Sequence, residues 1–208
     1  MEKKLQSKEI VSKLREAYGI KKFFTWARPW ICPFDKFIFQ VPKNQSIFDV
    51  GCGNGAFLFL LATFREPKKL YGVDVSENNL SIVKNIFPNT KYNKVNNISD
   101  WPKENFNVIT VIDVLHHIKP EEQHEFINKI LNKIKPGGTL IIKDMSTKPW
   151  YFAIMNTIHD LIFANQLIHY FPFNELIQII KKNGFEIKEI NSKILLWYSH
   201  EWVVAIKK

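Results

Sequence analysis

A glycine-rich turn between an apolar strand and an apolar helix constrains this chain more than any other feature. Residues 46–57 read SIFDVGCGNGAF, with Gly51, Gly53 and Gly55 in the turn. Glycine lets backbone approach a ligand without a Cβ in the way, and a helix beginning there offers unpaired N–H groups and a partial positive charge. The stretch predicts a site for part of a nucleotide-like ligand, and Gly51, Gly53 and Ala56 also fit the dinucleotide pattern G-x-G-x-x-G/A.

A carboxylate at the end of the first strand separates two interpretations of this turn. Asp49 lies two positions before Gly51, where a negative charge is costly without a partner. It disfavours a pyrophosphate and favours a ligand that carries a sulfonium or ammonium cation. The sequence D-V-G-C-G-N-G, with Cys52 inside the turn, resembles the first motif of the class I S-adenosylmethionine-dependent methyltransferases. In that family the turn packs against the methionine part and the ribose of the cofactor, so the resemblance implies S-adenosyl-L-methionine as the cofactor.

A second carboxylate lies at the end of the next expected strand, residues 69–75. Asp74, which precedes Val75, follows Gly55 by about twenty residues, the spacing at which an acidic side chain can bind ribose hydroxyls in doubly wound folds. It matches the family's acidic residue after the second strand. The alternative role is a helix N-cap, for which Ser76 is better placed.

The segment from Asn96 to Pro102 resembles the family's adenine-binding turn. It places Asn97 where the family commonly has aspartate and Ile98 where a side chain packs on the adenine face. The carbonyl oxygen of the Asn97 side chain can accept a hydrogen bond from the adenine amino group. The alternative is an ordinary polar loop.

The expected fourth strand, residues 106–114, reads as a parallel strand buried on both faces. It runs into D-V-L-H-H-I, which resembles the family's motif at the end of strand four. In open parallel sheets the chemistry collects beyond the carboxyl ends of the strands, so Asp113 is expected near the methionine end of the cofactor or the acceptor. His116 and His117 are candidate general bases, because imidazole titrates near neutral pH. The alternative role for these histidines is packing and hydrogen bonding.

The remaining elements predict an α/β fold with a Rossmann-like, seven-stranded, mostly parallel sheet that ends in an antiparallel strand pair. The phrase I-K-P-G-G-T-L-I-I, residues 134–142, closely resembles a further family motif. It predicts a turn at Pro136-Gly137-Gly138 that ends a helix, followed by a strand over residues 139–143. Residues 185–190 and 195–206 read as the closing antiparallel pair, which dinucleotide domains generally lack.

We expect one domain over residues 1–208. It comprises an aromatic N-terminal cap (1–42), a cofactor-binding core (46–145), an acceptor-covering insertion (146–173) and a C-terminal helix with the strand pair (174–208). The cap either folds over the cofactor and acceptor pocket or covers the sheet edge. The aromatic insertion favours a hydrophobic acceptor, an aromatic ring or a lipid-like chain, with plain core packing as the alternative.

Composition narrows the partners and the location. The formal net charge is +9, from lysines scattered along the chain. Such lysines usually form a solvated surface, and the alternatives are an anionic acceptor, peripheral contact with an anionic membrane, or nucleic acid, which is disfavoured because no basic cluster appears. The two cysteines, Cys32 and Cys52, have no metal-ligand spacing, so we expect no metal and no disulfide framework. Without a secretory signal or an uninterrupted apolar span, the chain is expected to be cytoplasmic.

These features together predict an enzyme that transfers a methyl group, by in-line displacement, from S-adenosyl-L-methionine to a small, hydrophobic, aromatic or lipid-like acceptor. The residues after strand four lack the family's N-P-P-Y type motif, which argues against the exocyclic amines of nucleic acids or glutamine. The alternatives are an RNA methyltransferase, a non-catalytic binding module with this fold, and a nicotinamide-dependent oxidoreductase, against which Asp49 and the terminal strand pair argue.

Overall fold

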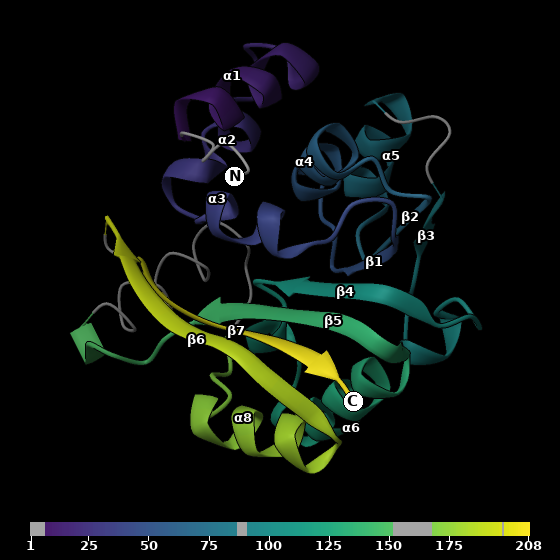
Figure 1. Ribbon diagram of the computed structural model, residues 1–208. Helices are drawn as coiled ribbons and strands as arrows, with labels where there is room; N and C mark the ends of the chain where they lie inside the picture. The colour runs from purple at the N-terminus through teal and green to yellow at the C-terminus, as the bar shows by residue number, and fades with distance from the viewer. Residues whose placement is uncertain (1–6, 87–90, 152–167, 197) are drawn as a thin grey trace. The chain divides into compact units, whose positions relative to one another are not determined.

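The computed structural model describes residues 7–86, 91–151, 168–196 and 198–208. Seven strands form one mixed sheet in the order β3-β2-β1-β4-β5-β7-β6, which confirms the predicted α/β fold class (Figure 1). The chain divides into two units, Met1–Trp101 and Pro102–Lys208. The predicted single-domain organisation with its four segments stays a prediction.

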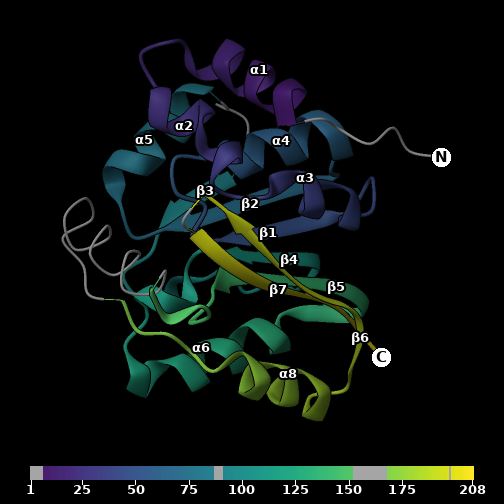
Figure 2. The same ribbon diagram turned by 90° about the vertical axis from the view of Figure 1, so that its left-hand side faces the viewer.

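The first unit begins with short helices. They are α1 (Ser7–Tyr18), α2 (Phe23–Trp26), η1 (Arg28–Trp30), α3 (Phe34–Phe37) and η2 (Ile38–Gln40). In α1 the buried residues Ile10, Leu14 and Tyr18 recur at helical spacing, and the backbone leaves the helix at Gly19, whose φ is +75°. Figure 2 shows α2 lying beside α1 within this unit.

Three parallel strands with two helices between them complete the first unit. The elements are β1 (Ser46–Val50), α4 (Ala56–Arg65), β2 (Lys69–Asp74), α5 (Glu77–Ile86), β3 (Lys91–Lys94) and η3 (Ile98–Asp100). β2 pairs with β1 on one side and β3 on the other, and the register places Asp49 opposite Gly72. The carboxyl ends of β1 and β2 therefore lie next to each other, which brings the glycine turn after β1 to the end of β2.

The second unit is a four-stranded sheet with two helices on one face. The elements are β4 (Phe106–Ile112), η4 (Leu115–His117), α6 (Pro120–Asn132), β5 (Ile134–Met145), α8 (Phe173–Lys182), β6 (Phe185–Leu195) and β7 (Tyr198–Lys207). β4 and β5 are parallel, and β7 is antiparallel to both β5 and β6. Figures 1 and 2 show α6 and α8 on the same face, where His124 Nε2 lies 3.2 Å from Glu175 Oε1.

Several predicted boundaries in the second unit were wrong. β5 begins at Ile134, so the Pro136-Gly137-Gly138 turn lies in a bulge of this strand and does not end the helix before it. The bulge requires glycine, because a Cβ on Gly138 would lie 2.8 Å from the Asn107 carbonyl oxygen. Cross-strand pairing extends β6 to Leu195, beyond the predicted 185–190. The second closing strand, predicted over 195–206, runs from Tyr198 to Lys207.

The ends of two buried strands were placed slightly too far along the chain. β4 ends at Ile112 rather than 114, and β2 ends at Asp74, which leaves Val75 outside the strand and 68% exposed. Most of the predicted acceptor-covering insertion, residues 152–167, lies outside the described residues. Among the described residues, none belongs to a helix long and apolar enough to cross a membrane.

Candidate cofactor and acceptor sites

The glycine turn is fixed to the end of β2 by backbone hydrogen bonds. The N–H groups of Gly51 and Cys52 both donate to the Val73 carbonyl oxygen, at 2.8 and 2.9 Å. Gly51, Gly53 and Gly55 have φ values of +71°, +55° and +82°, the left-handed region that glycine adopts at low cost. A Cβ built on Gly53 would meet no atom within 4 Å, so open space lies beside this residue. The turn therefore has the shape that the sequence predicts for close approach of a ligand.

Asp74 joins the glycine turn to the start of α5. Its Oδ2 accepts a hydrogen bond from the Gly53 N–H at 2.8 Å, and its Oδ1 accepts one from the Ser76 N–H at 2.9 Å. Ser76 is the helix cap, because its Oγ accepts from the Asn79 N–H at 3.3 Å. A carboxylate has about four acceptor positions, so Asp74 retains capacity for a hydroxyl donor. The ribose-binding role of Asp74 and the cofactor-binding role of its neighbour Val75 stay predictions.

Two carboxylates lie close to the thiol in the turn. Asp49 is 3% exposed and Cys52 is 7% exposed. Burial, and then the negative charges of Asp49 and Asp74, raise the pKa of the Cys52 thiol, which is therefore protonated at neutral pH. The turn thus combines open space with a locally negative electrostatic potential, which favours a ligand with a cationic group.

Asn54 ties the turn to the N-terminal helices. Its carbonyl oxygen accepts a hydrogen bond from the Tyr18 hydroxyl at 3.0 Å, and its side-chain amide donates to Thr25 Oγ1 at 2.7 Å. Burial, followed by the nearby Cys52, raises the pKa of Tyr18. The predicted N-terminal cap therefore contacts the turn directly within the first unit, and the sequence alone gave no indication of Asn54's role.

The predicted adenine turn forms the short helix η3, and side chains of the turn itself cap the N-terminus of this helix. Asn97 Oδ1 accepts from the Ser99 N–H at 2.9 Å, while Asp100 Oδ2 accepts from the Asn96 and Asn97 N–H groups at 2.8 and 3.2 Å. These backbone hydrogen bonds lower the pKa of Asp100. The amide of Asn97 thus has a structural role, and adenine binding by Asn97 and half-buried Ile98 stays a prediction.

Asp113 pairs with a lysine from the neighbouring strand in the second unit. Lys143 Nζ contacts Asp113 Oδ1, and the lysine side chain is fully buried. The Asp113 N–H also donates to the Lys143 carbonyl oxygen at 3.0 Å, and Asp113 has a φ of +58°, which is uncommon outside glycine. The predicted contact of Asp113 with the cofactor or acceptor stays a prediction. The signal missed in the sequence was a lysine in an apolar strand, since a fully buried lysine is almost always paired.

His116 and His117 lie in different environments although they are adjacent in the chain. His116 is 1% exposed, and both its backbone and its ring contact one carboxylate: its N–H donates to Asp144 Oδ2 at 3.1 Å, and its Nδ1 contacts Asp144 Oδ1. His117 is exposed, and its ring centroid lies 4.0 Å from that of His116. The structure therefore forms a histidine–carboxylate pair at His116, and Asp144 is a residue that the sequence analysis did not single out.

The segment that contains His169 is hydrogen-bonded to η4, the short helix that carries His116. The His169 N–H donates to the His116 carbonyl oxygen at 2.7 Å. Gln123, buried in α6, donates through Nε2 to the carbonyl oxygens of Leu115 and His169, at 3.1 and 2.8 Å. These bonds hold the backbone of η4, and with it His116, in a fixed position.

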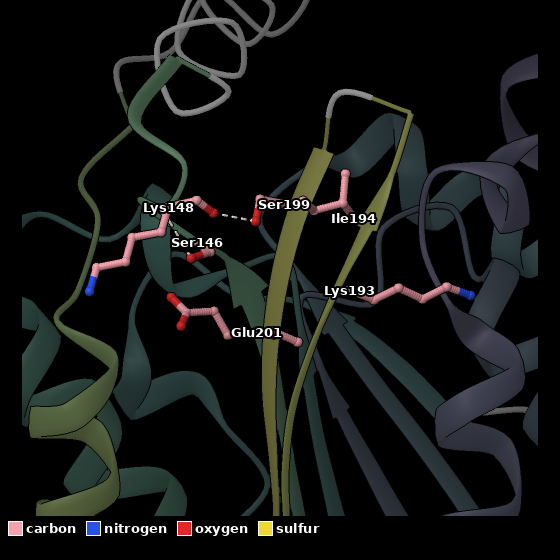
Figure 3. A pocket seen from close by; sticks show the side chains of 7 residues that line it. Ser146, Lys148, Lys193, Ile194, Ser199 and Glu201 are labelled. Carbon is pink, nitrogen blue, oxygen red and sulfur yellow. Dashed lines mark hydrogen bonds between the residues drawn. The ribbon is translucent and has the colours of Figure 1, made fainter.

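A cavity of about 410 Å³ lies where β5 and β6 end and β7 begins. It is lined by Ser146, Lys148, Ser192, Lys193, Ile194, Ser199 and Glu201. Figure 3 shows the Glu201 carboxylate pointing toward Ser146 and Lys148, whereas Lys193 extends away from them. Burial raises the pKa of Glu201, against the lowering effects of a Ser146 hydrogen bond and the Lys148 charge. Glu201 lies opposite Asp144 in the β5–β7 register, and neither Asp144 nor His116 lines the cavity.

Comparison with known proteins gives one family for the chain. A family model described as a methyltransferase domain matches residues 27–190. A carboxy-S-adenosyl-L-methionine synthase of Campylobacter jejuni subsp. doylei is 26% identical over 192 residues, which cover 80% of this chain and 79% of that protein. A tRNA N(3)-cytidine methyltransferase of Danio rerio is 32% identical over 112 residues, which cover 49% of this chain. The match spans only 32% of that longer protein.

Solved structures show the same fold. The magnesium protoporphyrin IX methyltransferase of Synechocystis PCC 6803, crystallised with bound S-adenosyl-L-homocysteine, superposes with a TM-score of 0.68 at 17% sequence identity. The superposition covers 95% of this chain and 99% of that one.

Proposed function

The chain belongs to the methyltransferase domain family and is an S-adenosyl-L-methionine-dependent methyltransferase, and from this premise we propose that its acceptor is a small molecule with an apolar body and a proton-bearing hydroxyl or amine. The observation that carries the proposal is the buried His116–Asp144 pair at the end of β5. Such a pair is suited to an acceptor that has to lose a proton.

The residues of the glycine turn fit the cofactor. The open space beside Gly53 leaves room for a ligand against the backbone, and the negative potential of Asp49 and Asp74 suits a sulfonium. Asp74 would bind the ribose hydroxyls, and Asn97 and Ile98 would contact the adenine. When bound, S-adenosyl-L-methionine supplies an electrophilic methyl group on a good leaving group, so much of the protein's contribution is positioning.

We assign the proton acceptor to His116. With Nδ1 directed at Asp144, the neutral ring carries its lone pair on Nε2, the atom that would take the proton from the acceptor's O–H or N–H group. Asp144 orients the ring and stabilises the imidazolium that results. His117, whose side chain is exposed, is the less suited of the two predicted bases.

The cavity would receive the polar end of the acceptor. Its volume of about 410 Å³ lies within the range for small-molecule sites. Ser146 and Lys148 provide hydrogen-bond donors, and Glu201 can accept or, when protonated, donate. Trp150 and Tyr151, which follow Lys148 closely in the chain, have exposed rings with centroids 6.0 Å apart, which supports an apolar or aromatic body on the acceptor.

The test is a methyl-transfer assay with isotope-labelled S-adenosyl-L-methionine and three acceptor groups: phenols and other hydroxylated aromatics, long-chain lipids, and unmodified tRNA. We expect labelling of hydroxylated small molecules. His116→Asn and Asp144→Asn should each lower kcat by about 10²–10⁴-fold, with unchanged affinity for S-adenosyl-L-homocysteine. His117→Asn is the matched control and should change kcat by less than about threefold, since an exposed side chain makes few contacts. Equal activity of the His116 and His117 variants would remove the proton-transfer role.

Methylation of RNA is the second candidate, favoured by the resemblance to a tRNA methyltransferase and by the formal charge of +9. Labelling of tRNA alone, with an affinity that falls steeply as salt rises, would support it over the small-molecule proposal.

A further inference from the structure

Five side chains that follow α1 form an exposed aromatic patch, made up of Ile20, Phe23, Phe24, Trp26 and Trp30. Ile20 is 67% exposed, Phe23 48%, Phe24 83% and Trp30 47%, while Trp26 is half-buried. Single exposed apolar residues are ordinary, whereas a contiguous group marks a surface that another body covers.

The rings of the aromatic patch are held in place by one another. The Phe23 centroid lies 4.9 Å from Trp26, 5.7 Å from Phe24 and 6.4 Å from Trp30, all edge to face. The Trp26 indole N–H donates to the Ile20 carbonyl oxygen at 3.2 Å. On the inner side, Thr25 and Pro29 are buried. The patch is thus an ordered outward face of α2 and η1.

The aromatic patch carries positive charge only. Residues 19–30 contain Lys21, Lys22 and Arg28 and no acidic residue. Lys21 and Lys22 are exposed and directly precede Phe23. The neighbouring cation on α1, Arg15, has its guanidinium 5.6 Å from the Trp26 ring centre. Glu16, the next residue after Arg15, is paired with Lys13 at 3.2 Å.

Aromatic rings with flanking lysines fit the interface of an anionic lipid bilayer. Ile20, Phe23 and Phe24 have no hydrogen-bonding groups, so affinity has to come from transferring apolar atoms out of water. Lysine ammonium groups add attraction to anionic headgroups, which falls off within a Debye length. We propose that the aromatic patch binds this protein to anionic membrane surfaces, with Phe24 entering the headgroup region and Lys21 and Lys22 contacting lipid phosphates.

Sedimentation with vesicles tests the proposal without any acceptor. The whole protein is spun down with vesicles of phosphatidylcholine and phosphatidylglycerol, and with phosphatidylcholine alone. We expect binding to the anionic vesicles that weakens as salt rises. Phe24→Ser should weaken it about tenfold or more, because one apolar anchor is lost. The double variant Lys21→Gln/Lys22→Gln should weaken it about tenfold at low salt and reduce its dependence on salt.

Matched controls come from the second unit. Ile190→Ser removes an apolar side chain that is 52% exposed, and Lys181→Gln/Lys182→Gln removes an exposed lysine pair on α8. Both controls should bind vesicles like the original protein, and all variants should keep its melting temperature and its affinity for S-adenosyl-L-homocysteine. Vesicle binding by Phe24→Ser equal to that of the original would overturn the proposal. Loss of RNA binding by Phe24→Ser, with its vesicle binding intact, would also overturn the proposal. Neither result bears on the acceptor assay, so the two proposals fail separately.

Discussion

Gly53→Ala is the most direct perturbation of the cofactor site, because it adds one methyl group at the turn and nothing else. Its φ of +55° makes alanine there less favourable by about 1–2 kcal/mol. For a chain of 208 residues this lowers the melting temperature by about 2–8 °C. No protein atom lies within 4 Å of the added Cβ, so no steric clash adds to this loss.

Gly137→Ala is a control with matched backbone strain. Gly137 has a φ of +72°, and a Cβ there would also meet nothing within 4 Å. It lies in the bulge of β5 in the second unit and is not part of the glycine turn. Both variants should therefore lose similar stability, and a difference between them in ligand affinity reports on the space beside Gly53 rather than on folding.

We expect Gly53→Ala to weaken binding of S-adenosyl-L-homocysteine by at least about tenfold, or about 1.4 kcal/mol, because the methyl group occupies space that the ligand needs. Gly137→Ala should bind like the original protein. Isothermal titration calorimetry gives the affinities, and thermal unfolding gives the stabilities. Equal affinity of the two variants would show that the cofactor does not lie against Gly53, and our interpretation of the turn would be wrong.

Two further predictions concern titrating groups. Burial raises the pKa of Glu201 above its ordinary value of 4.5, so its ionised form is less favourable in the folded chain, and its contribution to stability falls as pH rises above 4.5. Glu201→Gln should therefore be more stable than the original protein near pH 7 and unfold at a higher temperature. The gain in the free energy of unfolding should be less than about 1 kcal/mol, because solvent screens a half-exposed group, and it should disappear near pH 4. A gain that grows on acidification would contradict this prediction. Cys32 and Cys52 are 1% and 7% exposed, and burial raises the pKa of Cys52, so neither thiol should react with a disulfide reagent at pH 8 until the protein is unfolded. Rapid labelling of Cys52 in the folded protein would show that the turn is open to solvent.

The first half of the fold was predictable because each local signal agreed with the next. The sequence allowed one assignment here: a strand over residues 46–50, then the glycine turn, then a helix from Ala56. The next helix, residues 77–86, begins and ends where its capping residue and apolar spacing indicate. The terminal antiparallel pair was also predicted, since its alternating apolar residues and turn chemistry are local features.

Contacts between strands account for what the sequence did not show. Lys143 and Asp144 are consecutive in β5, but alternation of side chains along a strand sends them to opposite faces. There Lys143 pairs with Asp113 and Asp144 with His116, partners that lie about thirty residues earlier in the sequence. Neither pair has a fixed spacing that a local pattern could reveal. The histidine motif therefore indicated candidate bases, but only the strand register distinguishes His116 from His117.

Asn54 connects the two functional features of the first unit. Its side chain bonds to Thr25, on the buried side of the aromatic patch, and its backbone lies between Gly53 and Gly55 in the cofactor turn. A contact that orders α2 therefore also restrains the turn, and a ligand that orders the turn restrains α2. Thermodynamic linkage makes any such effect reciprocal. If the aromatic patch binds a membrane, the same hydrogen bond would couple membrane binding to cofactor binding, which gives a lipid-like acceptor a physical route to enzyme that is already loaded.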